Sequence, residues 1–248
     1  MIDVHTHILP SLDDGAATLE QSLEMAHAAV AEGITTVVAT PHVRDDYPTT
    51  AAEMEEAVAE LRVAVAADGL ALEILTGGEI ALDRLETLDD GALHRFALGS
   101  GSYVLLECPY FGWPLNLEHA ARELRRRGLS VILAHPERNS DATPRRIAPL
   151  VDDGVLVQVT SASLDGRLGR TSRAAAFALV DDGLAHVVAS DAHAPDLRAV
   201  GMKAATDALG DDALATWLTF AVPQAIVTGA GLPPRPAARR RRRPLFGR

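Results

Sequence analysis

The chain has 248 residues, of which 48% are hydrophobic and 23% are charged, as is ordinary for a soluble globular protein. No apolar run approaches the roughly 18 residues of a membrane span. A candidate site that begins at His5 leaves no room for a removable signal sequence. The single cysteine, Cys108, excludes an internal disulfide framework and is typical of a reducing compartment. These features predict one main domain in the cytoplasm.

The formal net charge of −11 is distributed unevenly along the chain. Residues 231–248 contain seven arginines and no carboxylate, so removing these seven positive charges leaves a body of −18. An acidic body argues against specific nucleic-acid binding, because phosphate backbones are bound by basic surfaces. Prolines among the arginines predict a disordered basic tail at 231–248, after a domain at 1–230. A purely solvated tail and an interaction tail both remain open.

Strand-like apolar segments alternate with capped helical segments along the chain. The expected strands are 2–5, 34–40, 72–76, 103–107, 129–135, 155–160 and 185–191. Helices are expected at 18–32, 50–69, 116–127, from 143 onward, at 171–182 and within 197–227, and capping boxes at Thr18 and Thr50 open the first two. This alternation implies a parallel sheet, and seven repeats approach a closed barrel. An open doubly wound sheet fits the same pattern.

Metal-capable side chains follow six of the seven expected strands. His5 and His7 project to the same side of the first strand, because side chains alternate with period two. The other candidates are His42, Glu79, Glu107, His135, Asp191 and His193 at later strand ends, and Asp14 in the first loop. Carboxyl ends of barrel strands meet on one face, so these nine residues predict a metal site. The remaining histidines, His27, His94, His119 and His186, are expected to be ordinary surface or packing residues.

Seven segments of the sequence contain the ends of the expected strands, and six of them contain the candidate metal ligands. They read DVHTHILPSLDDGA, VVATPHV, LTGGEI, LLECP, LAHPERN, QVTSASLDGRLG and SDAH. Together they resemble the PHP (polymerase and histidinol phosphatase) superfamily, over residues 1–230. Within it, the chain is similar to the bacterial manganese-dependent protein tyrosine phosphatases encoded with capsule and exopolysaccharide genes. It departs from that pattern at Ser11, where the family usually has Gly, and at Val43, where a second His often follows His42.

This resemblance implies a distorted seven-stranded (β/α)7 barrel that holds three metal ions. The first ion would be bound by His5, His7, Glu79 and Asp191, the second by Glu79, Glu107 and His135, and the third by Asp14, His42 and His193. Glu79 would therefore bridge two ions. Imidazole and carboxylate ligands suit manganese, and they suit iron or zinc as well.

The resemblance also implies that Arg138 and Arg198 bind the phosphoryl group in catalysis, since planar guanidinium groups donate bidentately to phosphate. A surface role is the alternative for Arg198. Metal ions about 3.5–4 Å apart clamp a phosphoryl group while one of them generates hydroxide near neutral pH. No phosphoenzyme is expected, because a cysteine phosphatase needs Cys-x5-Arg and the sixth residue after Cys108 is Pro114.

Phosphotyrosine on a protein is the expected substrate, and Tyr110, Phe111 and Trp113 are expected to form an open rim that binds it. Packing within their own loop is the alternative for these aromatic residues. The family points to a membrane-associated bacterial tyrosine kinase of polysaccharide biosynthesis as partner. Arg239 to Arg243 would then contact the anionic inner face of the membrane. Two rival functions remain: a small-molecule phosphomonoesterase such as a histidinol-phosphate phosphatase, and a non-enzymatic metal-bound module recruited by its tail.

Overall fold

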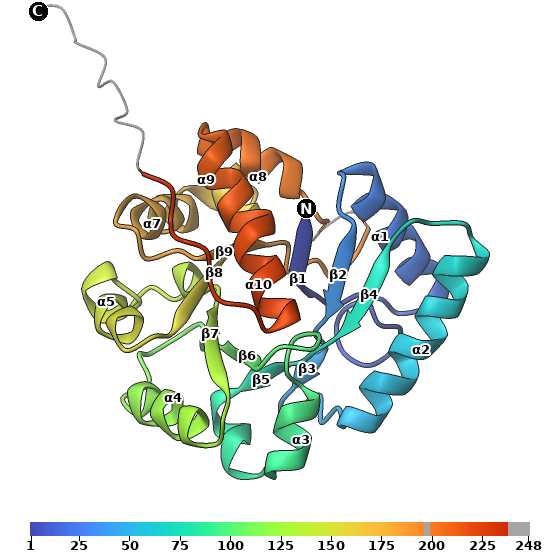
Figure 1. The fold of residues 1–248 in the computed structure, drawn as a ribbon, viewed down its shortest axis with the longest axis horizontal. Coiled ribbons are helices and arrows are strands. Elements are labelled where there is room, and N and C mark those ends of the chain that lie inside the picture. Colours follow the sequence, from blue (N-terminus) through green and yellow to red (C-terminus); the bar gives the residue numbers. More distant parts are fainter. Residues whose placement is uncertain (196–198, 238–248) are drawn as a thin grey trace, which may run out of the picture.

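Parallel strands occupy the centre of the molecule and helices surround them (Figure 1). The structure is a computed structural model that describes residues 1–195 and 199–237. One sheet contains, in spatial order, β1 (Ile2–Thr6), β2 (Thr36–Ala39) and β4 (Glu73–Thr76). The second sheet contains β3 (His42–Val43), β5 (Glu79–Ala81), β6 (Tyr103–Glu107), β7 (Ser130–Ala134), β8 (Leu156–Thr160) and β9 (Val187–Ala189). All these pairings are parallel, which confirms the expected parallel α/β fold.

Two interruptions divide the strands into these two sheets. β2 ends before Pro41, which has no N–H to donate, and the chain resumes as β3. β4 ends before Gly77 and Gly78, and the chain resumes as β5. A Cβ atom on Gly77 would lie 2.7 Å from a Leu98 methyl group, so the backbone passes too close to the core for a larger residue. No closed sheet forms within the described residues, and the seven-stranded barrel is not observed in the strand pairing.

The end of β1 lies beside the segment that follows β9. The amide of Asp191 donates to the carbonyl of His5 at 2.8 Å, and the amide of His7 donates to the carbonyl of Ala192 at 2.8 Å. Thr6 and Ala192 form a parallel bridge between the two sheets. These bonds place the first pair of histidines next to Asp191 and the segment that follows it.

The outer layer consists of helices that pack on the strands. They are α1 (Leu19–Ala31), α2 (Ala51–Ala67), α3 (Asp90–Arg95), α4 (Leu117–Arg126), α5 (Pro144–Asp152), α6 (Ser161–Asp165), α7 (Gly169–Asp181), α8 (Met202–Leu209), α9 (Asp212–Thr216) and α10 (Val222–Thr228). Shorter helical turns cover Leu82–Glu86, Pro136–Arg138 and Trp217–Ala221. None of the helices in the described ranges is long and apolar enough to cross a membrane.

The two expected capping boxes have different outcomes. Thr50 and Glu53 form the reciprocal pair of hydrogen bonds, so the capping box of α2 is confirmed. At α1, the Thr18 side chain accepts from the Gln21 amide, but the Gln21 side chain accepts from the amide of Ala17 instead of Thr18. The reciprocal box predicted at Thr18 is therefore wrong, and only its capping half is present.

Part of the expected tail lies against the body. The Arg235 guanidinium donates to the carbonyl of Val180, in the last turn of α7, at 2.9 Å and to the carbonyl of Ala185, beyond the end of α7, at 2.6 Å. The Trp217 indole donates to the carbonyl of Pro233 at 3.1 Å, and the Arg235 guanidinium lies 5.1 Å from the centre of the Trp217 ring. Residues 238–248, which include the expected membrane contact at Arg239 to Arg243, lie outside the described residues, as does the candidate Arg198.

Candidate metal centre

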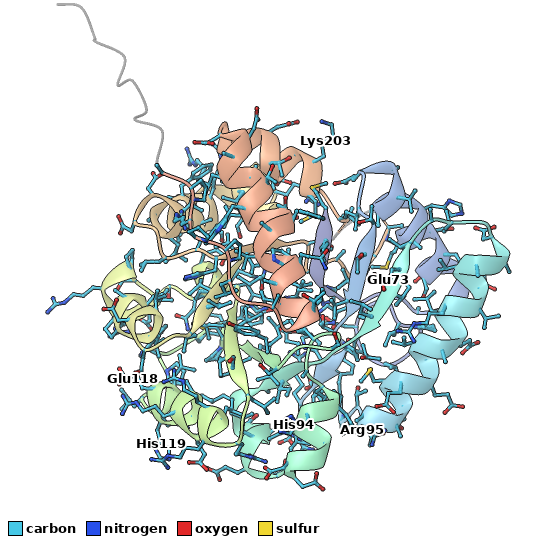
Figure 2. All side chains as sticks on the ribbon, in the orientation of Figure 1. Glu73, His94, Arg95, Glu118, His119 and Lys203 are labelled. Carbon is cyan, nitrogen blue, oxygen red and sulfur yellow. The ribbon has the colours of Figure 1, made fainter. Side chains whose placement is uncertain are left out.

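The nine side chains predicted as metal ligands lie together, most of them at the carboxyl ends of strands; His42 and Glu79 follow β2 and β4 and are the first residues of β3 and β5. They form four overlapping groups: His7, Asp14, His42 and His193; His5, His135 and Asp191; His5, His7 and Glu79; and His42, Glu79 and Glu107. Within each group, the candidate ligand atoms all lie within 4.8 Å of one another. By contrast, His94 and His119 belong to none of these groups and lie on the outer helices α3 and α4 (Figure 2).

The first two histidines direct their Nε2 atoms toward each other and toward the carboxylates of Glu79 and Asp191. Their Nε2 atoms lie 3.2 Å apart. The Nδ1 atom of His5 lies 3.1 Å from Gln158 Oε1, and the Nδ1 atom of His7 lies 2.7 Å from Asp13 Oδ2. In a neutral imidazole, each of these acceptors would take the proton of Nδ1 and leave the Nε2 lone pair for a metal ion. Burial opposes protonation of His7, but Asp13, Asp191 and Glu79 raise its pKa well above the usual value, so this ring attracts positive charge.

Glu79 lies at the centre of the cluster and is fully buried. Its Oε1 atom lies 2.8 Å from His135 Nε2, and its Oε2 atom lies 2.9 Å from His42 Nδ1. Oε2 also lies 3.4 Å from the Nε2 atoms of both His5 and His7. Although it is surrounded by nitrogens, Oε2 has no hydrogen-bond partner with suitable geometry among the described residues. A buried carboxylate oxygen in this position fits a ligand that bridges metal ions.

Asp14 completes the cluster from the first loop. Its Oδ1 atom lies 3.4 Å from the Nε2 atoms of both His42 and His193. The His193 ring donates from Nδ1 to the carbonyl of Asp191 at 2.9 Å, which directs its Nε2 toward Asp14. Hydrogen bonds from His193 and His42 hold the pKa of Asp14 below its usual value, although burial opposes this effect.

The carboxylates give the cluster a strong attraction for positive charge. Burial lowers the pKa of His42, but Asp14 and Glu79 more than offset it and raise this pKa to about 9. Burial likewise opposes the ionisation of Glu79, yet the neighbouring His5 and His135 rings hold its pKa well below the usual value. The carboxylate therefore stays ionised. The positive charge that it attracts can be a proton or a divalent metal, and nitrogen and oxygen ligands without thiolates fit manganese, iron or zinc.

The structure groups several of these residues differently from the family-implied sets, since His7 also lies with Asp14, His42 and His193. Glu107 lies with His42 and Glu79, whereas His135 lies with His5 and Asp191. Glu79 joins the two arrangements, since its two oxygens reach His135 and His42. Glu107 is also paired with Arg44, whose Nη1 atom lies 3.2 Å from Glu107 Oε1.

Two ligand candidates have a left-handed backbone conformation. The φ angles are +35° at His135 and +53° at Asp191, and Ser11 at +61° is the other such non-glycine residue in the described ranges. For a residue other than glycine, this backbone conformation is roughly 1–2 kcal/mol less favourable than the ordinary right-handed or extended one. The amide of His135 is held by Gln158 Oε1 at 3.2 Å, which helps to fix the turn at the end of β7. The same feature explains the family preference at residue 11, because glycine adopts a positive φ without strain.

Arg138 and Tyr110 extend the centre on one side. The Arg138 guanidinium donates to Asp191 Oδ2 at 2.5 Å and lies 4.7 Å from the centre of the Tyr110 ring. The Tyr110 ring stacks on His135 at 6.0 Å. Burial raises the pKa of Tyr110 to about 12, so this phenol stays protonated. Arg138 therefore reaches the candidate ligand cluster while it lies against the Tyr110 ring.

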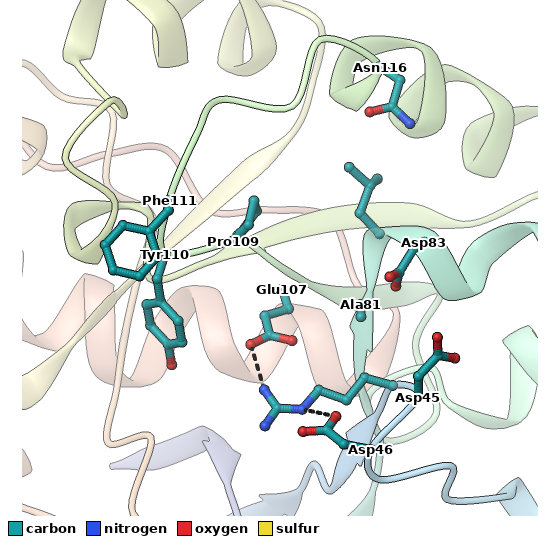
Figure 3. A pocket seen from close by; sticks show the side chains of 11 residues that line it. Asp45, Asp46, Ala81, Asp83, Glu107, Pro109, Tyr110, Phe111 and Asn116 are labelled. Atoms are coloured by element: carbon teal, nitrogen blue, oxygen red, sulfur yellow. Dashed lines mark hydrogen bonds and ion pairs between the residues drawn. The ribbon is translucent and has the colours of Figure 1, made fainter.

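An open cavity of about 760 Å³ adjoins the centre (Figure 3). Its lining includes Glu107, Tyr110 and Phe111, with Asp45 and Asp83 at the other side. Phe111 is 88% exposed, whereas Trp113 is partly buried against the hydrophobic core. The three aromatic residues of this loop are thus placed in different ways: Tyr110 stacks at the centre, Phe111 faces solvent and Trp113 packs inward.

The family model for capsular polysaccharide synthesis, CpsB/CapC, matches residues 1–219. The chain belongs to the CpsB/CapC family. It is 38% identical to the tyrosine-protein phosphatase YwqE of Bacillus subtilis, over 78% of this chain and 77% of YwqE. It is 31% identical to the putative tyrosine-protein phosphatase CapC of Staphylococcus aureus, over 78% of this chain and 77% of CapC.

Solved structures agree with this membership. The crystal structures of YwqE from Bacillus subtilis and CpsB from Streptococcus pneumoniae, described as unique metal-dependent tyrosine phosphatases, provide a match with a TM-score of 0.83. That match has 32% sequence identity and covers 96% of this chain and 100% of the other. The resemblance drawn from the sequence motifs is thereby confirmed.

Two residues that orient candidate ligands in this CpsB/CapC chain were not predicted. The side chain of Asp13 is buried, and its carboxylate accepts from the amides of His42 and Gly15 at 2.9 Å and faces His7. Burial would raise the pKa of Asp13, but His7 and these bonds hold it at about 2. Gln158 lies inside β8 and is fully buried. A polar residue at the centre of the apolar segment LVQVT is the sequence signal that could have indicated Gln158.

Proposed function

We propose that the chain is a metal-dependent phosphatase that hydrolyses phosphotyrosine on proteins. The observation that carries this proposal is the convergence of nine nitrogen and oxygen ligands around Glu79 in a member of the CpsB/CapC family. The relatives named above are tyrosine-protein phosphatases, and the related solved structures are described as metal-dependent.

We propose that the metal ions are held by the nine residues described above and that manganese is the physiological metal. The Nε2 atoms of His5 and His7 face each other and Glu79, whose Oε2 atom has no hydrogen-bond partner among the described residues, and this arrangement supports the assignment. When bound, divalent ions supply Lewis acidity and activate water near neutral pH. The chain itself orients the ligands, because Gln158 and Asp13 fix the His5 and His7 rings.

Arg138 is proposed to bind the phosphoryl group, and Tyr110 and Phe111 to bind the aryl group of the substrate. The position of Arg138 beside Asp191 and above Tyr110 supports this role. Cys108 does not serve as a nucleophile in this proposal. Its thiol is 1% exposed, and burial raises its pKa to about 12, with the Glu137 carboxylate adding to the effect. A thiol with this pKa stays protonated, and the thiolate is the reactive form.

A comparison of two substrates tests this function. Wild-type protein reconstituted with manganese is assayed with a phosphotyrosine peptide and with histidinol phosphate at equal concentrations. A kcat/KM that is higher for the peptide supports the proposal. A higher kcat/KM for histidinol phosphate indicates a small-molecule phosphomonoesterase, and the absence of turnover with either substrate indicates a metal-bound module without activity.

We further propose that residues 1–230 form one distorted seven-stranded barrel, followed by a basic tail. The bridge between Thr6 and Ala192 supports this view, because it connects the two sheets at the ligand cluster. Joining β2 with β3 and β4 with β5 gives seven strand segments in chain order. A hydrogen-exchange experiment that finds these nine strands protected as one cooperative unit would agree with a single barrel domain.

We also propose that the tail brings the enzyme to an anionic membrane and thus to a membrane-associated tyrosine kinase. The sequence places five consecutive arginines at 239–243, each contributing about 1 kcal/mol of attraction before screening. Truncation after Ala237 removes these arginines and keeps the contacts of Arg235. The truncated protein should bind anionic vesicles more weakly at low salt, with unchanged turnover of a soluble phosphopeptide. Equal vesicle binding by both proteins would contradict a membrane role.

A further inference from the structure

One amide side chain holds the loop that carries the exposed aromatic residue. Asn139 is 3% exposed and follows Arg138 in the chain. Its Nδ2 group donates to the carbonyls of Pro109 at 2.5 Å and Gly112 at 2.9 Å. Its Oδ1 atom accepts from the amide of Asp141 at 2.7 Å. Both N–H bonds of the amide are therefore used to hold one loop.

This loop has little other polar support. Residues 109–113 belong to no helix or strand, and within the described residues they make no backbone-to-backbone hydrogen bond. The two carbonyls that Asn139 holds lie on either side of Tyr110 and Phe111 in the sequence. The backbone position of both aromatic residues thus depends on Asn139.

The two aromatic side chains have different surroundings. Tyr110 is fixed between His135 and Arg138. Phe111 is 88% exposed and lines two neighbouring hollows, one with Glu107 and the other with Arg138. An exposed phenyl ring next to a phosphate-binding group offers a flat surface for stacking with an aryl ring. The aryl ring of a phosphate ester held by Arg138 would lie within reach of such a surface.

We infer that Asn139 is a positioning residue that favours aryl phosphates by holding Phe111 beside the metal centre. This inference rests on the proposed phosphotyrosine phosphatase function and adds a determinant of substrate class. Asn139 does not touch the phosphoryl group and acts only through the loop. An alkyl phosphate has no ring to stack on Phe111, so its binding does not depend on the position of the loop.

Substitution of Asn139 tests this inference with two classes of substrate. Asn139→Asp keeps the size of the side chain and the acceptor for Asp141, but it removes both donors to the loop. Loss of two hydrogen bonds is expected to raise KM for a phosphotyrosine peptide about tenfold. The kcat for the peptide should change far less, and KM for glycerol phosphate should stay at the wild-type value. An equal change for both substrates would overturn the inference.

A second substitution shows whether Asn139 acts through Phe111. Phe111→Ala, Asn139→Asp and the double variant are compared in a double-mutant cycle. We expect the Asn139 substitution to have no further effect on KM once the phenyl ring is absent. Additive effects would show that Asn139 acts in another way and would contradict the inference.

Fluorescence provides a readout that does not depend on catalysis. In a Trp217→Phe background, Trp113 is the single tryptophan, and it lies in the anchored loop. Asn139→Asp should increase the quenching of Trp113 by acrylamide. Unchanged quenching would overturn the anchoring role of Asn139, whereas a wild-type protein that hydrolyses no phosphotyrosine would overturn the proposed function instead.

Discussion

The Nε2 atoms of His5 and His7 lie 3.2 Å apart, and the Nδ1 atom of each ring faces an acceptor from elsewhere in the chain. Gln158 on β8 provides one acceptor, and Asp13 in the first loop provides the other. These two residues decide which nitrogen of each ring carries the proton. Affinity for metal should therefore depend on side chains that do not themselves bind metal.

Replacement of Gln158 tests this dependence. Gln158→Leu removes the acceptor from His5 and should lower affinity for manganese by about 10–100-fold. Gln158→Glu is the matched control, because it keeps an acceptor oxygen and Gln158 Nε2 has no hydrogen-bond partner among the described residues to lose. Titration calorimetry with manganese measures both variants. Wild-type affinity in Gln158→Leu would contradict the role of this acceptor.

Replacement of Glu79 tests the central position of its carboxylate. Glu79→Gln should lower metal content and phosphatase activity more than Glu107→Gln, because Glu79 takes part in two of the four ligand groups and Glu107 in one. Both substitutions make the same chemical change. Elemental analysis after dialysis measures the metal retained. Wild-type metal content in the Glu79→Gln protein would show that this carboxylate bridges no ions.

The left-handed backbone at Ser11 leads to a stability prediction. Ser11→Ala and Ser11→Gly both remove the hydroxyl, which donates to the Ala17 carbonyl at 2.7 Å. Only glycine relieves the strain of φ +61°, so Ser11→Gly should have a free energy of unfolding about 1 kcal/mol higher than Ser11→Ala. Urea unfolding measures the difference. An alanine variant as stable as the glycine variant would indicate that residue 11 is not strained.

The environment of His186 predicts a change of stability with pH. Burial lowers its pKa to about 4, and the positive charge of Arg235 adds to this effect. The folded state therefore resists protonation of His186, while the unfolded chain binds a proton near pH 6.5. His186 therefore causes no loss of folding stability well above pH 6.5, and the free energy of unfolding falls as the pH decreases from 6.5 toward 4.

The expected loss at His186 is about 2 kcal/mol between pH 7.5 and pH 5. His186→Gln stays neutral throughout this range and should lose correspondingly less stability. Urea unfolding of both proteins at the two pH values isolates the contribution of this residue, since the other titrating groups are shared. The same loss in both proteins would show that His186 is not the group responsible.

The convergence of the candidate ligands could be predicted because parallel strands share one carboxyl edge. Glu79 and Asp191 are far apart in sequence, but each follows a strand of the same direction, so both arrive at the same end of the fold. The alternation of strands and helices along the sequence was sufficient to predict that these residues converge. Local pattern was also sufficient for the Thr50 capping box, whose two partners lie within one helical turn.

Features that depend on contacts between distant segments could not be predicted in the same way. The division into two sheets follows from Pro41 and from the close packing at Gly77, which no local periodicity reveals. Gln158 acts on His5 across 153 positions of sequence. Arg235 was grouped with the tail by composition, and its bonds to the carbonyls of Val180 and Ala185 depend on the folded arrangement.

Controlled removal and return of metal tests the central proposal most directly. Protein is treated with a chelator in steps, and each fraction is analysed for transition metal and for turnover of a phosphotyrosine peptide. The arrangement of nine ligands predicts that turnover falls with metal content and returns when manganese is added. Full turnover in a fraction that contains no transition metal would contradict the proposed metal-dependent mechanism.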